Sequence, residues 1–148
     1  MLAQEVRELL NTNYFGYLCT RSEYPHITPI FFVYDQRSSI YFMSEYSSKK
    51  IRNILRDRHV SLVIDLRDED DPFNNEGILV FGTAKVYIPG EVEMYEYDIL
   101  YTVYELFKSK YSEFVEFEDR GDVIVEIKME RVSYWKGPFF KSYRMAES

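Results

Sequence analysis

The sequence predicts a mainly β protein, a mostly antiparallel barrel with a few helices packed on its outside. Three observations lead to this fold class. The segments with strand character outnumber those with helical character, connections of hairpin length join consecutive strands, and the strands have similar lengths. There is no internal repeat, low-complexity tract or linker, so we expect residues 1–148 to form one domain.

Helical periodicity predicts a short amphipathic helix over residues 2–11, with Leu2, Val6, Leu9 and Leu10 at helical spacing. Strands follow over 15–20, 26–34 and 40–43, separated by a turn at 22–25 and a hairpin loop at 35–39. Pro29 lies inside the second of these strands. It therefore marks a sheet edge, or a position whose missing backbone N–H is not needed for pairing.

The second half of the chain continues with a helix over about 47–57, whose apolar face holds Ile51, Ile54 and Leu55. Gly82 inside a later strand indicates a bend or a close backbone approach. Apolar residues recur at spacings of three and four over residues 91–111, which predicts that the longest helix lies there, before the last strand. The remaining expected elements are a strand at 59–65, a charged loop at 67–75, a strand at 77–88, the longest helix at 91–111, a strand at 122–129 and an aromatic-basic tail after Trp135.

Composition narrows the class of protein. The net charge is −7, which argues against non-specific nucleic-acid binding. No apolar run approaches the roughly 20 residues needed to span a bilayer, so we expect no membrane association. The single cysteine, Cys19, rules out an internal disulfide and favours a reducing compartment, and acidic residues near the N-terminus argue against a signal peptide. We therefore expect a cytoplasmic protein.

Several kinds of site have no support in the sequence. The histidines are only His26 and His59, too few with one cysteine for a zinc site, so no metal is expected. The acidic residues 68–71 do not have the spacing of a calcium loop and are interpreted as a solvated turn. No third group accompanies Cys19 as a nucleophile, and neither GxGxxG nor GxxxxGK[ST] occurs.

The helix near residue 48 has an unusual first turn. Lys49 and Lys50 stand where the positive end of the helix dipole favours acidic side chains. Residues 49–58 together hold five Lys or Arg and one acid, Asp57, whereas the rest of the chain has 13 Lys or Arg and 24 Asp or Glu. Two interpretations remain open, a solvated helix face or the binding site of a local anion.

The motifs GYLCT, PHITPIFFVYD, IYFMS, SSKKIRNILRDRHVSLVID, GTAKV and RVSYWKG follow one another in this order. In this arrangement the chain resembles the pyridoxamine 5′-phosphate oxidase-like, FMN-binding split-barrel family, over roughly residues 2–137. The resemblance implies a six-stranded antiparallel split β-barrel. It also implies a homodimer with two FMN molecules in clefts at the subunit interface.

The resemblance further implies which residues bind FMN. The Ser-Ser-Lys-Lys turn would hold the phosphate, because a helix N-terminus offers free N–H groups and positive dipole charge. The strand that begins at residue 26 would border the flexible end of the flavin, and the strand end at 43–44 would contact it. A late tryptophan would come from the partner subunit, the alternative being that it packs one end of the barrel. The implied cofactor-binding residues are His26, Ile27, Thr28, Pro29, Met43, Ser44, Ser48, Lys49, Lys50 and Trp135.

Two departures from the family pattern bear on activity. His26 stands where the oxidases have an arginine near the phosphate. Lys141 and Tyr143 stand where they have the Arg-x-His that holds vitamin B6, so we expect little oxidation of pyridoxamine 5′-phosphate. The leading hypothesis is an FMN-binding oxidoreductase with a small-molecule substrate that the sequence does not identify and no assigned catalytic side chain. The alternatives are a deazaflavin-dependent reductase, a non-catalytic flavin-binding protein and, disfavoured by two histidines, a haem-binding protein.

Overall fold

The computed structural model describes residues 2–35, 39–114 and 122–145. Strands dominate these ranges, as the sequence predicts, and no helix in them is long and apolar enough to cross a membrane. In chain order the elements are α1 (Gln4–Thr12), β1 (Phe15–Thr20), β2 (His26–Asp35), β3 (Ser39–Ser44), α2 (Lys49–Arg56), β4 (His59–Leu66), β5 (Glu76–Tyr87), the 3₁₀ helix η1 (Met94–Glu96), α3 (Tyr97–Tyr111), β6 (Val123–Lys136) and β7 (Phe139–Arg144).

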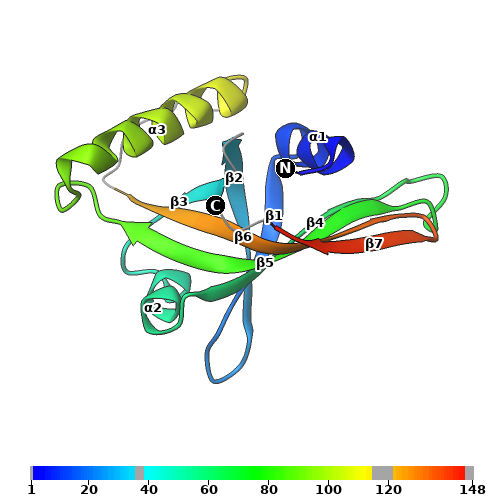
Figure 1. Ribbon diagram of the computed structural model, residues 1–148, viewed down its shortest axis with the longest axis horizontal. Helices are drawn as coiled ribbons and strands as arrows, with labels where there is room; N and C mark the ends of the chain where they lie inside the picture. Colours follow the sequence, from blue (N-terminus) through cyan, green and yellow to red (C-terminus); the bar gives the residue numbers. More distant parts are fainter. Residues whose placement is uncertain (1, 36–38, 115–121, 146–148) are drawn as a thin grey trace.

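Six antiparallel strands close into a barrel (Figure 1). Their order is β3-β2-β1-β4-β5-β6, and β3 pairs again with β6 to complete the ring. The predicted fold class, a mainly β protein with a six-stranded antiparallel barrel and peripheral helices, is therefore confirmed. A carboxylate lies at the seam, where the hydroxyls of Ser39, Tyr41 and Tyr87 all donate to Glu126. These contacts tie three strands together at the closure, and burial together with Glu126 raises the pKa of Tyr87 to about 12.

Three predicted boundaries were wrong. β6 runs on to Lys136 instead of stopping at 129, because a bulge opposite Phe81 and Gly82 shifts the register and reverses the alternation of inward and outward side chains. The tail forms the seventh strand, β7, paired to the end of β6. Asp35 and Ser39, expected in the hairpin loop, pair with each other in the sheet, and residues 36–38 lie outside the described residues.

The longest helix also begins later than predicted, at Tyr97 instead of residue 91. A turn with Gly90 at φ 88° precedes it. Glu93 and Glu96 then form a reciprocal capping box around η1, in which the Glu93 N–H donates to the Glu96 carboxylate. Close backbone approach at Gly82 is confirmed, because a Cβ there would collide with the Lys128 carbonyl.

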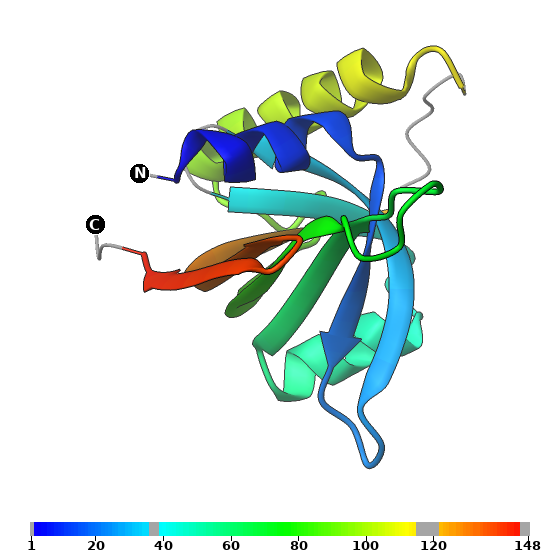
Figure 2. The ribbon, with the colours of Figure 1, turned by 90° about the vertical axis from the view of Figure 1, so that its right-hand side faces the viewer.

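Two helices lie at opposite ends of the barrel, α1 at the top and α2 at the bottom of both views (Figures 1 and 2). Both contribute to the main core. The buried side chains of α1 are Val6, Leu9 and Leu10, and those of α2 include Ile51 and Ile54. Because its ends are occupied by apolar side chains, the barrel has a filled interior rather than a channel.

The third helix packs against the outside of the barrel and supports β2 where that strand changes partners. Residues 26–31 of β2 pair with β1, and residues 32–35 pair with β3. At this junction the Tyr111 hydroxyl accepts from the Phe32 N–H at 3.0 Å and lies 2.6 Å from its carbonyl oxygen. Lys110 donates to the same carbonyl and to that of Leu10. The end of α3 thus satisfies backbone groups at the junction and connects β2 to α1.

Candidate functional site

The barrel opens between β2 and β3. Pairing between these strands begins at Phe32 and Phe42 and runs away from the opening, so β2 has no β3 partner over residues 26–31. The strand edge expected at Pro29 is therefore present. Ile27 and Pro29 are exposed on the outer face, while His26 and Thr28 are half-buried on the side of the interior. Met43 and Ser44 end β3 on the other side of the same opening.

The chain passes from β3 into α2 through a short turn that brings two serines together. The Oγ atoms of Ser44 and Ser48 lie 2.9 Å apart. Ser48 is the N-cap of α2, and its side chain makes no capping hydrogen bond. The first turn of α2 has no acidic residue and begins with Lys49 and Lys50. The N–H groups of this turn therefore lack a side-chain acceptor, and two cations stand beside them.

A buried polar contact connects α2 to the beginning of β2. The Asn53 side chain, fully buried, donates from Nδ2 to the Thr20 hydroxyl at 3.0 Å. Thr20 is the cross-strand partner of His26, whose ring Nδ1 is buried without a hydrogen-bond partner. The structure thus brings His26 to the helix that begins with Lys49. Sequence reasoning missed Asn53 and Thr20, although an asparagine between Ile51 and Ile54 on an apolar helix face was a usable signal.

Trp135 is distant from these groups within one chain. Met43 pairs with Ile124 near the beginning of β6, and Trp135 lies eleven residues further along that strand, about 36 Å at the usual rise. Its indole covers Gly77, where a Cβ would come within 2.5 Å of the ring. A single chain therefore brings together the predicted residues on β2, β3 and α2 but leaves Trp135 apart from them.

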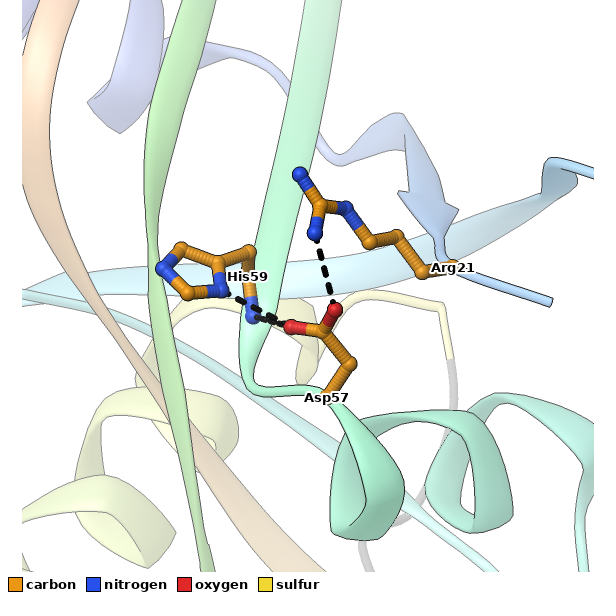
Figure 3. Close-up of polar contacts among 3 residues, drawn as sticks. All are labelled: Arg21, Asp57 and His59. Carbon is orange, nitrogen blue, oxygen red and sulfur yellow. Dashed lines mark hydrogen bonds and ion pairs between the residues drawn. The ribbon is translucent and has the colours of Figure 1, made fainter.

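A second polar cluster lies at the C-terminal end of α2 (Figure 3). The Asp57 carboxylate accepts from the backbone N–H of His59 at 3.0 Å, faces its ring Nδ1 at 2.8 Å, and accepts from Arg21 at 3.0 Å. These contacts, the His59 N–H first, lower the pKa of Asp57 to about 2. Both oxygens of this acid are thus already occupied by neighbours at the end of the helix.

The tail residues at the positions of the oxidases' Arg-x-His face α1. Lys141 forms an ion pair with Glu5 at 2.9 Å. The Tyr143 hydroxyl accepts a long hydrogen bond, 3.5 Å, from the Ala3 N–H, and its side chain packs against the main core. Both side chains therefore have partners within the fold.

Known structures share this architecture. The chain is similar to an FAD-binding protein from Mesorhizobium loti, at 18% identity and a TM-score of 0.70 over 90% of this chain and 94% of that one. General stress protein 26 from Bacillus anthracis is 19% identical, with a TM-score of 0.67, and the alignment covers 96% of this chain and 97% of that one. A heme-binding protein from Mycobacterium smegmatis is 14% identical, with a TM-score of 0.73. The alignment covers 97% of this chain and 59% of that longer chain.

At these identities the structural likeness shows the fold alone. No curated protein matches the chain. The family described as Pyridoxamine 5′-phosphate oxidase matches residues 2–136, which is nearly the whole described chain. The match covers the opening between β2 and β3, the basic first turn of α2, and Trp135. The chain therefore belongs to the pyridoxamine 5′-phosphate oxidase family.

Proposed function

We propose that this protein binds FMN at the N-terminus of α2 and acts as a flavin-dependent oxidoreductase. The observation that carries the proposal is the first turn of this helix. It has no side-chain cap and no acid, and Lys49 and Lys50 stand at its positive end. A phosphate group complements such a turn because it accepts hydrogen bonds from the free N–H groups and neutralises the two ammonium groups.

The opening of the barrel supports the placement of the rest of the cofactor. His26 is next to the phosphate-binding helix through Thr20 and Asn53, and its Nδ1 has no partner in the fold. The edge of β2 over residues 26–29 and the end of β3 at Met43 and Ser44 flank the same opening. These groups would border the flavin, whose ring supplies hydride chemistry when bound. The chain's own residues would bind, orient and shield it.

We further propose that the working unit is a homodimer. The outer face of β1, β2 and β5 exposes five large apolar side chains, at fractions between 41% and 66%: Phe15, Tyr17, Ile27, Phe31 and Phe81. The registers place Tyr17 and Phe15 opposite Pro29 and Phe31, so the face is continuous across β1 and β2. A patch of this kind is characteristic of an interface. A second copy would also supply Trp135, which cannot reach the site of its own chain.

Oxidation of vitamin B6 is not part of the proposal. Lys141 and Tyr143 contact Glu5 and Ala3 within the fold, and Tyr143 has no positive charge to pair with a substrate phosphate. We propose a different small-molecule substrate, with electrons passing through the flavin.

The visible absorbance of the protein as purified, followed by titration of apoprotein with FMN, tests the proposal. A flavin, a deazaflavin and a haem have different visible spectra, so one measurement separates the three cofactors. We expect a flavin spectrum and saturable FMN binding. Tight binding without reduction by any nicotinamide donor would instead favour a non-catalytic flavin-binding protein.

A further inference from the structure

Asn53 and Thr20 are the two most buried polar residues in the described part of the chain, with exposed fractions of 0% and 1%. Their contact joins α2 to the end of β1, since the Asn53 amide donates to the Thr20 hydroxyl at 3.0 Å. Burying a polar pair costs hydration free energy that two apolar side chains would not lose. A pair kept at this cost indicates a role in positioning as well as in stability.

A second contact sets the orientation of the Asn53 amide. The guanidinium of Arg56, one turn later in α2, donates from Nη2 to Asn53 Oδ1 at 3.2 Å. A guanidinium can only donate, so the carbonyl oxygen of the amide faces Arg56 and its NH2 group faces Thr20. The amide therefore has one arrangement in which both hydrogen bonds form.

These hydrogen bonds restrict how α2 can slide or rotate against the barrel. The buried apolar side chains of the helix, Ile51 and Ile54, are less sensitive to a small displacement, because the hydrophobic effect has no direction. A hydrogen bond is directional and weakens steeply when its geometry changes. Asn53 therefore supplies the contact that distinguishes one placement of the helix from those next to it.

The placement of α2 matters because the helix is attached on both sides of the barrel opening. On the β3 side, the Oγ atoms of Ser48 and Ser44 lie 2.9 Å apart. On the other side, Asn53 contacts Thr20, the cross-strand partner of His26, where the open edge of β2 begins. Asn53 thus relates the first turn of α2 to the strand edge that borders the opening.

We infer that Asn53 is a positioning residue, which holds the first turn of α2 at the distance from the β2 edge that FMN requires. The inference rests on the proposed function and names the residue that connects its phosphate site to its flavin site. FMN uses both sites, so its affinity depends on their separation, whereas riboflavin has no phosphate and uses the strand edge alone.

Affinities for FMN and riboflavin, measured by fluorescence titration of apoprotein, test the inference in five variants. Asn53→Leu and Thr20→Val each remove one partner of the buried contact, and the double variant removes both. Thr20→Ser keeps the hydroxyl. Ile54→Val is the matched control, because it shortens a buried side chain of α2 without changing the polar contact. Thermal unfolding midpoints verify that each variant folds and report its stability.

We expect Asn53→Leu and Thr20→Val each to weaken FMN binding at least fivefold and riboflavin binding less than twofold, with the double variant no weaker than the poorer single. Thr20→Ser and Ile54→Val should lower the unfolding midpoint but keep the ratio of the two affinities within twofold of wild type. Equal losses for both ligands, a control that changes the ratio as much as Asn53→Leu, or no loss at all overturn the inference and leave FMN binding intact. Failure of wild type to bind FMN overturns the proposed function as well.

Discussion

The Lys110 ammonium lies 4.0 Å from the centre of the Phe32 ring and donates a 3.1 Å hydrogen bond to the Phe32 carbonyl. Its other acceptor is the Leu10 carbonyl, at 3.2 Å. No carboxylate accompanies this cation among its hydrogen-bond partners, and burial lowers the pKa of Lys110 to about 8. A charged group is thus held by dipoles and an aromatic face at the point where β2 changes partners.

The first prediction follows from this pKa. Between about pH 8 and the ordinary lysine pKa near 10.5, unfolded Lys110 holds its proton while the folded form has lost it, so the free energy of unfolding rises with pH. Relative to Lys110→Met, we expect wild type to gain about 1 kcal/mol between pH 7.5 and 9.5, after allowance for partial solvent exposure. Urea unfolding at several pH values measures this gain.

The exposed neighbour Lys108 provides the control, since Lys108→Met should follow wild type across the series. Above about pH 10 the tyrosines begin to titrate, and those with raised pKa values, such as Tyr87, reverse the slope. A difference between wild type and Lys110→Met that does not change with pH would contradict the prediction.

The second prediction concerns the first turn of α2. Replacing both Lys49 and Lys50 by alanine should weaken FMN affinity at least tenfold, because two charge-assisted phosphate contacts contribute roughly 2–4 kcal/mol. Riboflavin, which lacks the phosphate, should lose much less. Calorimetry with both ligands measures the contrast, and equal losses would mean that the lysines act on something other than phosphate.

The third prediction tests the shared site. Light scattering should give about twice the chain mass of 17.8 kDa at micromolar concentration. Lys49→Ala/Lys50→Ala and Trp135→Ala homodimers should each bind FMN poorly. When the two variants are mixed and allowed to exchange subunits, half of the sites in each mixed dimer combine intact groups, so tight binding should return at those sites. Absence of recovery in verified mixed dimers would show that Trp135 does not act across the interface.

The fourth prediction concerns the substrate. FMN-loaded protein should be reduced very slowly or not at all by pyridoxamine 5′-phosphate, because Tyr143 has no positive charge for the substrate phosphate and Lys141 is paired with Glu5. Anaerobic stopped-flow mixing with this compound, and separately with NADH and NADPH, measures the rate at which flavin absorbance is lost. Rapid bleaching by the B6 compound would disprove the assignment, and bleaching by a nicotinamide alone would identify a flavin reductase.

Local patterns in the sequence were sufficient to predict most strands of the barrel and the beginning of α2. Ser48, Lys49 and Lys50 are neighbours in the chain, so their place at the beginning of α2 could be predicted from the sequence, whereas an anion bound there stays a prediction. The limit of β6 was not predictable from alternation, because the bulge beside Gly82 reverses which residues face inward. β7 was missed since its side chains are exposed or only half-buried on both faces, and a strand without a buried face has no clear apolar period.

Contacts between distant segments were the other limit. Asn53 meets Thr20 across 33 residues, and nothing local to either residue predicts the pair. The separation of Trp135 from α2 depends on the register of β6 against β3, which only the closed barrel defines.

Pro29 has a further consequence for the open edge of β2. A strand edge with apolar side chains such as Ile27 and Phe31 can act as a template for the addition of a strand from another molecule, the first step of many aggregates. Proline has no N–H to donate in such a ladder, and it stands in the middle of the six residues that lack a β3 partner. The edge can therefore remain open to a small molecule while it resists aggregation by strand addition.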